Sequence, residues 1–190
     1  MSSDAVSNLI TAHGGYVVRK LTDAQAGRLP VFVIARPTAY RTCKYLFSVA
    51  RGLPPLHVAW VQACVAAGAV VDATPFALPA GLLHGQHLLF LPPVPHTSFH
   101  ALSRERRPLA GTRVVVSGEY GLREWRLLAH AAGAALVDSD EFARRRAKAD
   151  VVVCTGGRGG KVARAAHAQG VPVVTTDWAI QSLVQQTSLP

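Results

Sequence analysis

The stretch Gly52-Leu-Pro-Pro-Leu-His-Val-Ala-Trp60 occurs a second time, with changes, as Gly170-Val-Pro-Val-Val-Thr-Thr-Asp-Trp178. The glycine, the proline and the tryptophan coincide at a spacing of 118 residues. Two further blocks repeat in the same order at a spacing of 119 residues: Ala12–Val18 with Ala131–Val137, and Val31–Ala35 with Asp150–Cys154. Three blocks in one order indicate a tandem duplication, so the chain is predicted to fold as two similar units.

Each copy is predicted to be a small α/β unit. In the second copy, the β-branched run Thr112–Ser117 is typical of a buried strand, and Leu122–Ala132 has the apolar spacing of a helix face. Gly133 and Gly170 end helices, because glycine readily adopts the left-handed turn that a helix C-terminus needs. Further strands are predicted at Ala134–Val137, Asp150–Cys154 and Val171–Val174, and helices at Lys161–Gln169 and from Trp178 onward, capped by Thr176 and Asp177. This alternation implies a four-stranded parallel sheet flanked by helices.

The first copy follows the same order from Val6 onward but lacks the first strand. The counterpart of Val114, in the first strand of the second copy, would lie before residue 1. A sheet without that strand exposes a central strand edge, so we expect either that this sequence is part of a longer chain, which we favour, or that the strand is supplied from elsewhere. The predicted domains are residues 1–81 (unit one) and 110–190 (unit two), joined by a linker at 82–109 that contains Pro92, Pro93 and Pro95.

The composition predicts a globular chain with an affinity for anions. Lysine and arginine number 20 against 11 acidic residues, and the net charge of +9 is divided almost evenly between the two halves. This balance is compatible with nucleic acid, with a phosphopeptide or with a merely solvated basic surface. The three cysteines are far apart with no CxxC spacing and the eight histidines form no ligand motif, so no disulfide framework, metal or other cofactor is predicted. No apolar run approaches ~18 residues, so no membrane association is predicted.

One glycine-rich segment imitates a nucleotide-binding loop but lacks the required residues. The segment Thr155-Gly-Gly-Arg-Gly-Gly-Lys161 has threonine where a P-loop needs glycine, and Val162 stands where it needs serine or threonine. The segment also follows a later strand of the unit and not the first strand, where a dinucleotide site would lie. Because no acid pair or nucleophile triad of suggestive spacing occurs either, no enzymatic activity is predicted.

The repeated blocks resemble the BRCT domain, and the resemblance covers nearly the whole chain. The residues that carry it are the glycines after the first helix and the G-[LV]-P block with its tryptophan: Gly14, Gly15, Gly52, Pro54, Trp60, Gly133, Gly170, Pro172 and Trp178. The segment Arg41-Thr42-Cys43-Lys44-Tyr45 is similar to the R-T-x-K-Y motif of tandem BRCT proteins that bind phosphoserine. Together with Leu78-Pro79-Ala80-Gly81, it resembles the tumour-suppressor-binding DNA-damage checkpoint mediators most closely.

The resemblance implies a role for each polar residue of this motif. In the family, the motif threonine and lysine bind phosphate with a Ser/Thr-Gly loop that follows the first strand, which assigns Thr42 and Lys44 to the phosphate. Arg41 is expected to bind the peptide backbone or a C-terminal carboxylate, about three residues past the phosphoserine. The physical chemistry agrees, because a helix N-terminus offers free amides and a partial positive charge. The Ser/Thr-Gly loop of unit one is expected before residue 1.

Unit two is expected to provide a wall for specificity and no second phosphate site. The positions that correspond to Arg41, Thr42 and Lys44 hold Gly159, Gly160 and Val162. The loop Ser117–Gly121 occupies the position that borders the peptide groove in the family. Glu119 and Tyr120 are therefore candidates for the wall.

Three functions follow from these observations. The first is a non-catalytic nuclear adaptor of the DNA-damage checkpoint that binds a phosphorylated histone tail or another phosphorylated protein. The second is a phosphate-independent scaffold that docks a folded partner on a BRCT surface or on the linker. The third is direct DNA binding through Arg144–Lys148. Without the motif, Arg41 and Lys44 would be interpreted as exposed charges at a helix start; the motif favours the first function.

Overall fold

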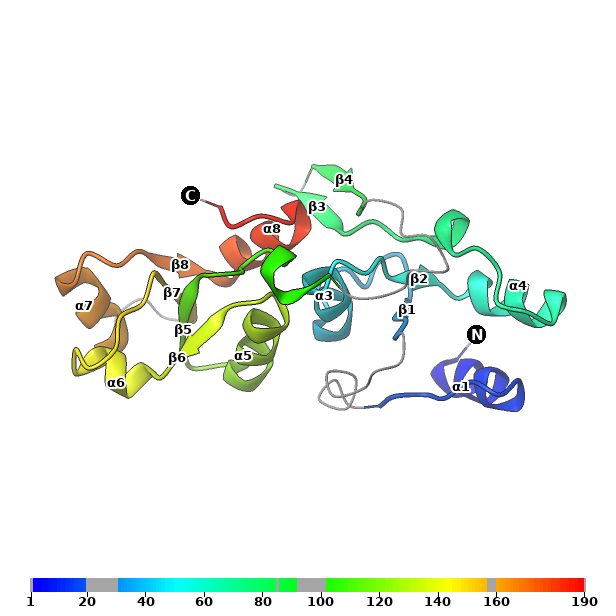
Figure 1. The fold of residues 1–190 in the computed structure, drawn as a ribbon, viewed down its shortest axis with the longest axis horizontal. Coiled ribbons are helices and arrows are strands. Elements are labelled where there is room, and N and C mark those ends of the chain that lie inside the picture. Colours follow the sequence, from blue (N-terminus) through cyan, green and yellow to red (C-terminus); the bar gives the residue numbers. More distant parts are fainter. Residues whose placement is uncertain (1, 20–30, 85, 92–101, 157–159, 190) are drawn as a thin grey trace.

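Unit two contains the larger sheet of the computed structural model, which describes residues 2–19, 31–84, 86–91, 102–156 and 160–189 (Figure 1). Four parallel strands lie in the order β6-β5-β7-β8. Their bounds are β5 (Arg113–Gly118), β6 (Ala135–Val137), β7 (Val151–Thr155) and β8 (Val173–Thr175). The predicted α/β unit with four parallel strands is thus confirmed for the second copy.

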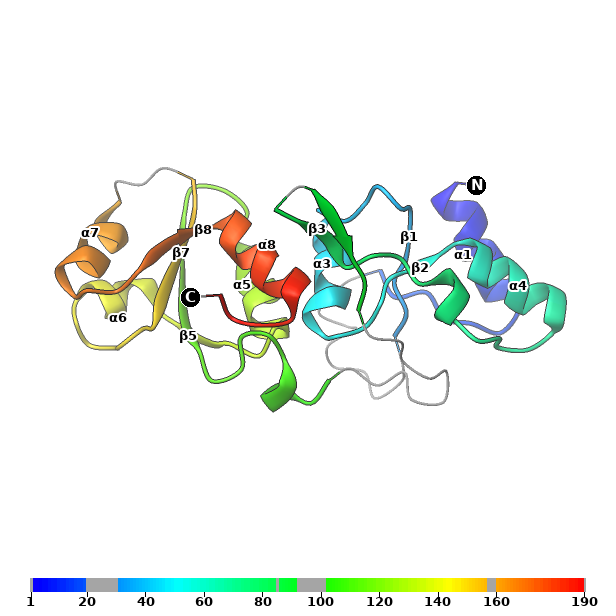
Figure 2. The ribbon, with the colours of Figure 1, turned by 90° about the horizontal axis from the view of Figure 1, so that it is seen from above.

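Helices cover both faces of this sheet. Val114 and Val116 of β5 pack toward α5 (Leu122–Ala131) and α8 (Thr176–Gln185). Val115, between them, packs on the opposite side with α6 (Ser139–Ala143) and α7 (Lys161–Ala168). Because successive side chains of a strand point to opposite faces, a continuous valine run fits a sheet buried on both sides (Figure 2).

Two features at the helix starts of unit two differ from the prediction. Helix α6 was not predicted; the Asp138 carboxylate caps it by accepting from the amides of Asp140 and Glu141, at 2.9 and 3.0 Å. Helix α8 begins one residue after Thr175, which is the N-cap, and no side chain caps it. The expected capping by Thr176 and Asp177 is therefore wrong, because the carboxylate of Asp177 is bonded elsewhere.

Unit one has a much smaller sheet. Its elements are α1 (Ser3–Ala12), β1 (Ile34–Ala35), α3 (Cys43–Ala50), β2 (Leu56–His57), α4 (Ala59–Ala67) and the short 3-10 helix η1 (Thr74–Phe76). Strands β1 and β2 pair in parallel, whereas the strand expected near 16–18 is not formed. In unit two the corresponding strand, β6, pairs only with β5. The described part of unit one has no counterpart of β5, so residues 16–18 have no such strand to pair with there.

The tryptophan of the repeated block is buried in unit one. Trp60 is 8% exposed, its ring centroid lies 4.8 Å from that of Phe32, and its Nε1 donates to the Val71 carbonyl at 3.0 Å. The glycines that begin the two blocks share one backbone conformation, with φ of +72° at Gly52 and +67° at Gly170. This left-handed conformation favours glycine, which explains why glycine occurs at both positions.

An antiparallel hairpin lies within the predicted linker and packs on unit two. It consists of β3 (Gly81–Leu83) and β4 (His87–Leu89), and the short 3-10 helix η3 (Arg104–Arg106) follows later. The side-chain amide of Gln181, in α8, donates to the Leu82 carbonyl at 3.0 Å and accepts from the His84 amide at 3.1 Å. The linker prolines Pro92, Pro93 and Pro95 lie outside the described residues.

Helix α3 joins the two units. Its last six residues, Tyr45–Ala50, are all buried, as expected for a helix surrounded by protein. These apolar side chains belong to one core cluster with Leu128 of α5, Leu183 of α8 and the valines of β5 and β7. The side-chain amide of Gln186 donates a hydrogen bond of 2.9 Å to the Val49 carbonyl. Thus α3 belongs to unit one by sequence and to the core of unit two by packing (Figures 1 and 2).

Candidate phosphate-binding site

The first amides of α3 have no acceptor among the described residues. Thr42 is the N-cap with extended backbone, and the first helical hydrogen bond runs from the Leu46 amide to the Thr42 carbonyl at 3.0 Å. The amides of Cys43, Lys44 and Tyr45 precede that bond and have no carbonyl acceptor within the helix. The Thr42 hydroxyl donates its single proton to the Ala39 carbonyl at 2.9 Å, so it would have to rotate away from that carbonyl to donate to a phosphate. Tyr45 is fully buried, so an anion at this helix end would meet the amides of Cys43 and Lys44 and the positive end of the helix dipole.

The charged side chains of the motif surround this helix end. Arg41, Thr42 and Lys44 are all exposed, whereas Tyr45 is fully buried and its hydroxyl donates to the Pro79 carbonyl at 2.6 Å. Burial raises the pKa of Tyr45 to about 12, so its phenol stays protonated and serves the fold. Lys44 makes no hydrogen bond or ion pair with any described residue. Its ammonium group is therefore available to an external anion.

Arg41 contacts the second unit. Its guanidinium forms an ion pair with the carboxylate of Asp177, in the first turn of α8. Both side chains remain well exposed, at 63% and 70%, so this ion pair is solvated and exchangeable. The arginine predicted to bind a ligand carboxylate thus already binds a carboxylate of the protein.

A second acidic residue of unit two lies close to the same helix end. Glu124, the third residue of α5, is exposed and forms no ion pair with a described residue. Burial and the nearby charge of Glu124 together raise the pKa of the Cys43 thiol, which begins α3. The first turns of α5 and α8 therefore both bring a carboxylate to the start of α3.

The predicted wall residues lie on the loop after β5. The amides of Glu119 and Tyr120 donate to the Thr155 carbonyl, at 3.1 and 3.3 Å, which holds the loop against the end of β7. Tyr120 is 71% exposed. Within the described part of the chain, no hydrogen bond or ion pair links either residue to the motif of unit one.

The equivalent helix start in unit two is built differently. Helix α7 begins at Lys161 after the N-cap Gly160, so its lysine stands one position earlier than Lys44 does in α3. Val162 occupies the position that corresponds to Lys44, and Gly159 lies outside the described residues. Lys161 nevertheless provides an internal comparison, because it is also an exposed lysine in the first turn of a helix.

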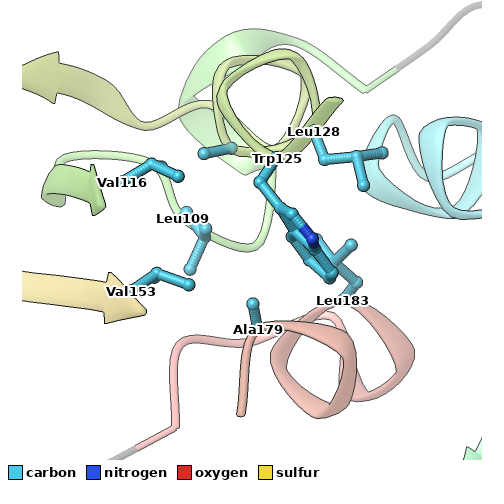
Figure 3. A pocket seen from close by; sticks show the side chains of 8 residues that line it. Leu109, Val116, Trp125, Leu128, Val153, Ala179 and Leu183 are labelled. Atoms are coloured by element: carbon cyan, nitrogen blue, oxygen red, sulfur yellow. The ribbon is translucent and has the colours of Figure 1, made fainter. Parts of the chain in front are cut away.

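A small pocket between α5 and α8 is apolar. Figure 3 shows the Trp125 ring between these helices, near Ala179 and Leu183, and the other lining residues are also apolar. The pocket contains no ionisable side chain and, at about 10 Å³, is too small to hold a ligand. Among the described residues, no three His, Cys, Asp or Glu side chains are grouped to hold a metal ion, and no helix is long and apolar enough to cross a membrane.

The sequence interpretation missed Asp177 and Glu124. Asp177 was interpreted as a helix cap, but a signal was present in the repeat, because unit one has the uncharged Ala59 at the corresponding position. A charge that appears in only one copy of a shared block is a candidate for function. Glu124 had no comparable signal, since glutamate at the third position of a helix is common for reasons of helix stability alone.

Comparisons with known proteins agree with this architecture. Residues 1–77 match a family model described as the BRCT domain, and residues 107–190 match one described as the BRCA1 C Terminus (BRCT) domain. The S. pombe Brc1 BRCT5-BRCT6 domains superpose with a TM-score of 0.60 at 15% identity, covering 98% of this chain and 88% of that chain.

Two further structures are similar at lower scores. One is Rad4 BRCT1,2 in complex with a Crb2 phosphopeptide, with a TM-score of 0.34 and 16% identity. The other is S. pombe Rad4 BRCT3,4, with a TM-score of 0.37 and 13% identity. Each comparison covers 98% of this chain and 86% of the other. From the two family matches and the fold, the chain belongs to the BRCT domain family and contains two BRCT units in tandem.

Proposed function

We propose that this chain is a non-catalytic adaptor that binds phosphoserine peptides at the start of α3. Lys44 supplies the charge and the first amides of the helix supply hydrogen bonds. The Thr42 hydroxyl adds one by rotating from the Ala39 carbonyl to the phosphate, and Arg41 contacts the peptide beyond the phosphoserine. Residues 1–81 form the domain that holds the phosphate, and residues 110–190 form the domain that provides the wall, with 82–109 as the connection. Glu119 and Tyr120 extend that wall.

The observation that carries the proposal is that Lys44, which has no partner among the described residues, lies beside helix amides that have no acceptor there. A phosphate bears a charge of about −1.5 to −2 at neutral pH and offers three acceptor oxygens, which these donors match in sign and number. The R-T-x-K-Y segment occurs in unit one alone, whereas the tryptophan block occurs in both units. If only unit one binds phosphate, the binding motif is expected in one copy and the residues that maintain the fold in both.

The biological setting is proposed from the family. Similarity to checkpoint mediators favours a nuclear role in DNA-damage signalling, with a phosphorylated histone tail or a phosphorylated partner protein as ligand. No cofactor is proposed for the binding event, because hydrogen-bond donors and a positive charge are all that a phosphate needs.

A matched pair of peptides tests the proposal. A fluorescent phosphoserine peptide and its unphosphorylated twin are titrated with the 190-residue chain, with Lys44→Met and with Lys161→Met as the control. We expect the phosphorylated peptide to bind at least about tenfold more tightly, Lys44→Met to remove that preference and Lys161→Met to keep it. Equal affinities of the wild-type chain for the two peptides would refute the proposal.

One structural feature favours the scaffold function as a second candidate. Leu88 of the hairpin and Phe90, just after it, are 55% and 61% exposed and lie within the predicted linker, where a folded partner was expected to dock. A partner that binds this surface would lose affinity when Leu88 and Phe90 are both replaced by serine, and would be indifferent to Lys44→Met. Pull-down with each variant separates the two functions.

A further inference from the structure

We infer that unit two selects the ligand by charge, through Glu124 and Asp177. The ligand that fits best is an internal phosphoserine segment with a lysine or arginine within four residues after the phosphoserine. An acidic residue or a free C-terminal carboxylate at those positions is disfavoured. This inference rests on the proposed function and defines the class of phosphopeptide that the site accepts.

The positive charge of Arg41 is already neutralised by a carboxylate of unit two. Its guanidinium is paired with Asp177, whose carboxylate is the group that an acidic ligand side chain or a chain end would have to displace. Replacing the Asp177 carboxylate by a ligand carboxylate gains little binding free energy, because both carboxylates are well solvated before binding. A carboxylate in the ligand therefore finds no unpaired cation at Arg41.

Glu124 is exposed and has no ion-pair partner among the described residues. The next residue of α5, Trp125, packs against the same core cluster as Cys43, which places the first turn of α5 beside the start of α3. Burial and, after it, the charge of Glu124 accordingly raise the pKa of the Cys43 thiol. The bound phosphate would sit on the amides next to Cys43, so its charge and that of Glu124 repel one another. A ligand with a cation beside its phosphate removes that repulsion and pairs with Glu124, whereas an acidic ligand increases the repulsion.

The charge of the phosphate itself supports the same conclusion. A phosphoserine bears about −1.5 to −2, which exceeds the single positive charge of Lys44, and Asp177 and Glu124 add carboxylates from the first turns of α8 and α5. A lysine or arginine next to the phosphoserine offsets part of this negative charge.

A charge scan of the ligand tests the inference. Acetylated and amidated phosphoserine peptides carry lysine, glutamine or glutamate at one of the four positions on either side of the phosphoserine. We expect lysine to bind about tenfold more tightly than glutamate at the best position, and that position to follow the phosphoserine, since two exposed carboxylates contribute about two- to fivefold each. The ratio should fall as salt is raised, because the contacts are exposed.

Matched variants assign the preference to the two residues. Glu124→Gln and Asp177→Asn, which remove charge and keep shape, should each reduce the lysine-to-glutamate ratio to about threefold or less. The controls are Glu141→Gln and Asp140→Asn, which occupy the same third and second positions in α6, away from α3, and should leave the ratio unchanged. Thermal melts of all four variants confirm that each is folded.

The outcomes are distinct for the two proposals. Phosphate-dependent binding without a charge preference, or with a preference that survives both Glu124→Gln and Asp177→Asn, would overturn this inference and leave the proposed function intact. Failure of every phosphopeptide to bind more tightly than its unphosphorylated twin would overturn the proposed function as well.

Discussion

Replacing Leu46 by alanine should destabilise both units together. Leu46 is 2% exposed in α3 and belongs to the core cluster that contains side chains of both units. Truncating a buried leucine to alanine costs about 2–5 kcal/mol, and we take about 3 kcal/mol for this site. The cost affects both units because the core cluster that contains Leu46 also contains Leu128 and Leu183 of unit two.

Urea unfolding followed by tryptophan fluorescence measures this effect for each unit. Trp60 reports on unit one, and Trp125 and Trp178 report on unit two, so Trp60→Phe and the double variant Trp125→Phe/Trp178→Phe isolate the two signals. With a slope of about 2 kcal/mol per molar urea, the loss corresponds to a fall of about 1.5 M in the midpoint. The unfolding midpoints reported by the two signals should both fall by this amount.

A result confined to one unit would refute this account of the fold. If Leu46→Ala shifted the Trp60 signal and left the signal of unit two unchanged, α3 would not be part of the shared core. Two separate transitions in the wild-type chain would lead to the same conclusion, because a shared core predicts that the units unfold together.

Three further predictions concern the hairpin, an ion pair and a buried phenol. Gly81→Ala should cost about 1–3 kcal/mol in urea unfolding, because its Cβ would lie 2.7 Å from a methyl group of the buried Val184. Hydrogen bonds from the side chain and the backbone amide of Arg113 lower the pKa of Asp150 in the folded protein. The stability that this pair contributes is therefore fully present above the pKa of Asp150 in the unfolded chain, about 4, and is lost as the pH falls through its lower pKa in the folded protein. Asp150→Asn should accordingly lower the melting temperature at neutral pH and approach the wild type in acid. Tyr45→Phe should cost about 1–2 kcal/mol in urea unfolding, since it leaves a buried carbonyl without its donor.

Local patterns predicted most of unit two because its elements have strong local signals. The β-branched run at 112–117 and the apolar helix spacing at 122–132 correspond to β5 and α5 within one or two residues. Helix α6 was missed because it has only five residues, and its clearest signal, the cap Asp138, is common in turns as well. Segments with full periodicity were predictable, and short capped segments were not.

The residues that complete the candidate site could not be found from local patterns. Arg41 and Asp177 are 136 residues apart, and only the packing of α3 on α8 brings them together. The motif Arg41–Tyr45 was visible from its resemblance to a family, but its electrostatic surroundings come from another unit. The missing strand at 16–18 has a similar cause, since pairing depends on a neighbour that local propensity does not reveal.

The most direct test of the central claim is to locate the phosphate on the protein. In an amide NMR titration with a phosphoserine peptide, we expect the largest shifts at the amides of Cys43, Lys44 and Tyr45, with smaller shifts at Glu124 and Asp177. The unphosphorylated twin should leave the three α3 amides unchanged. If the phosphorylated peptide moved the first turn of α7 or the hairpin and left the start of α3 unaffected, the claim that α3 holds the phosphate would be wrong.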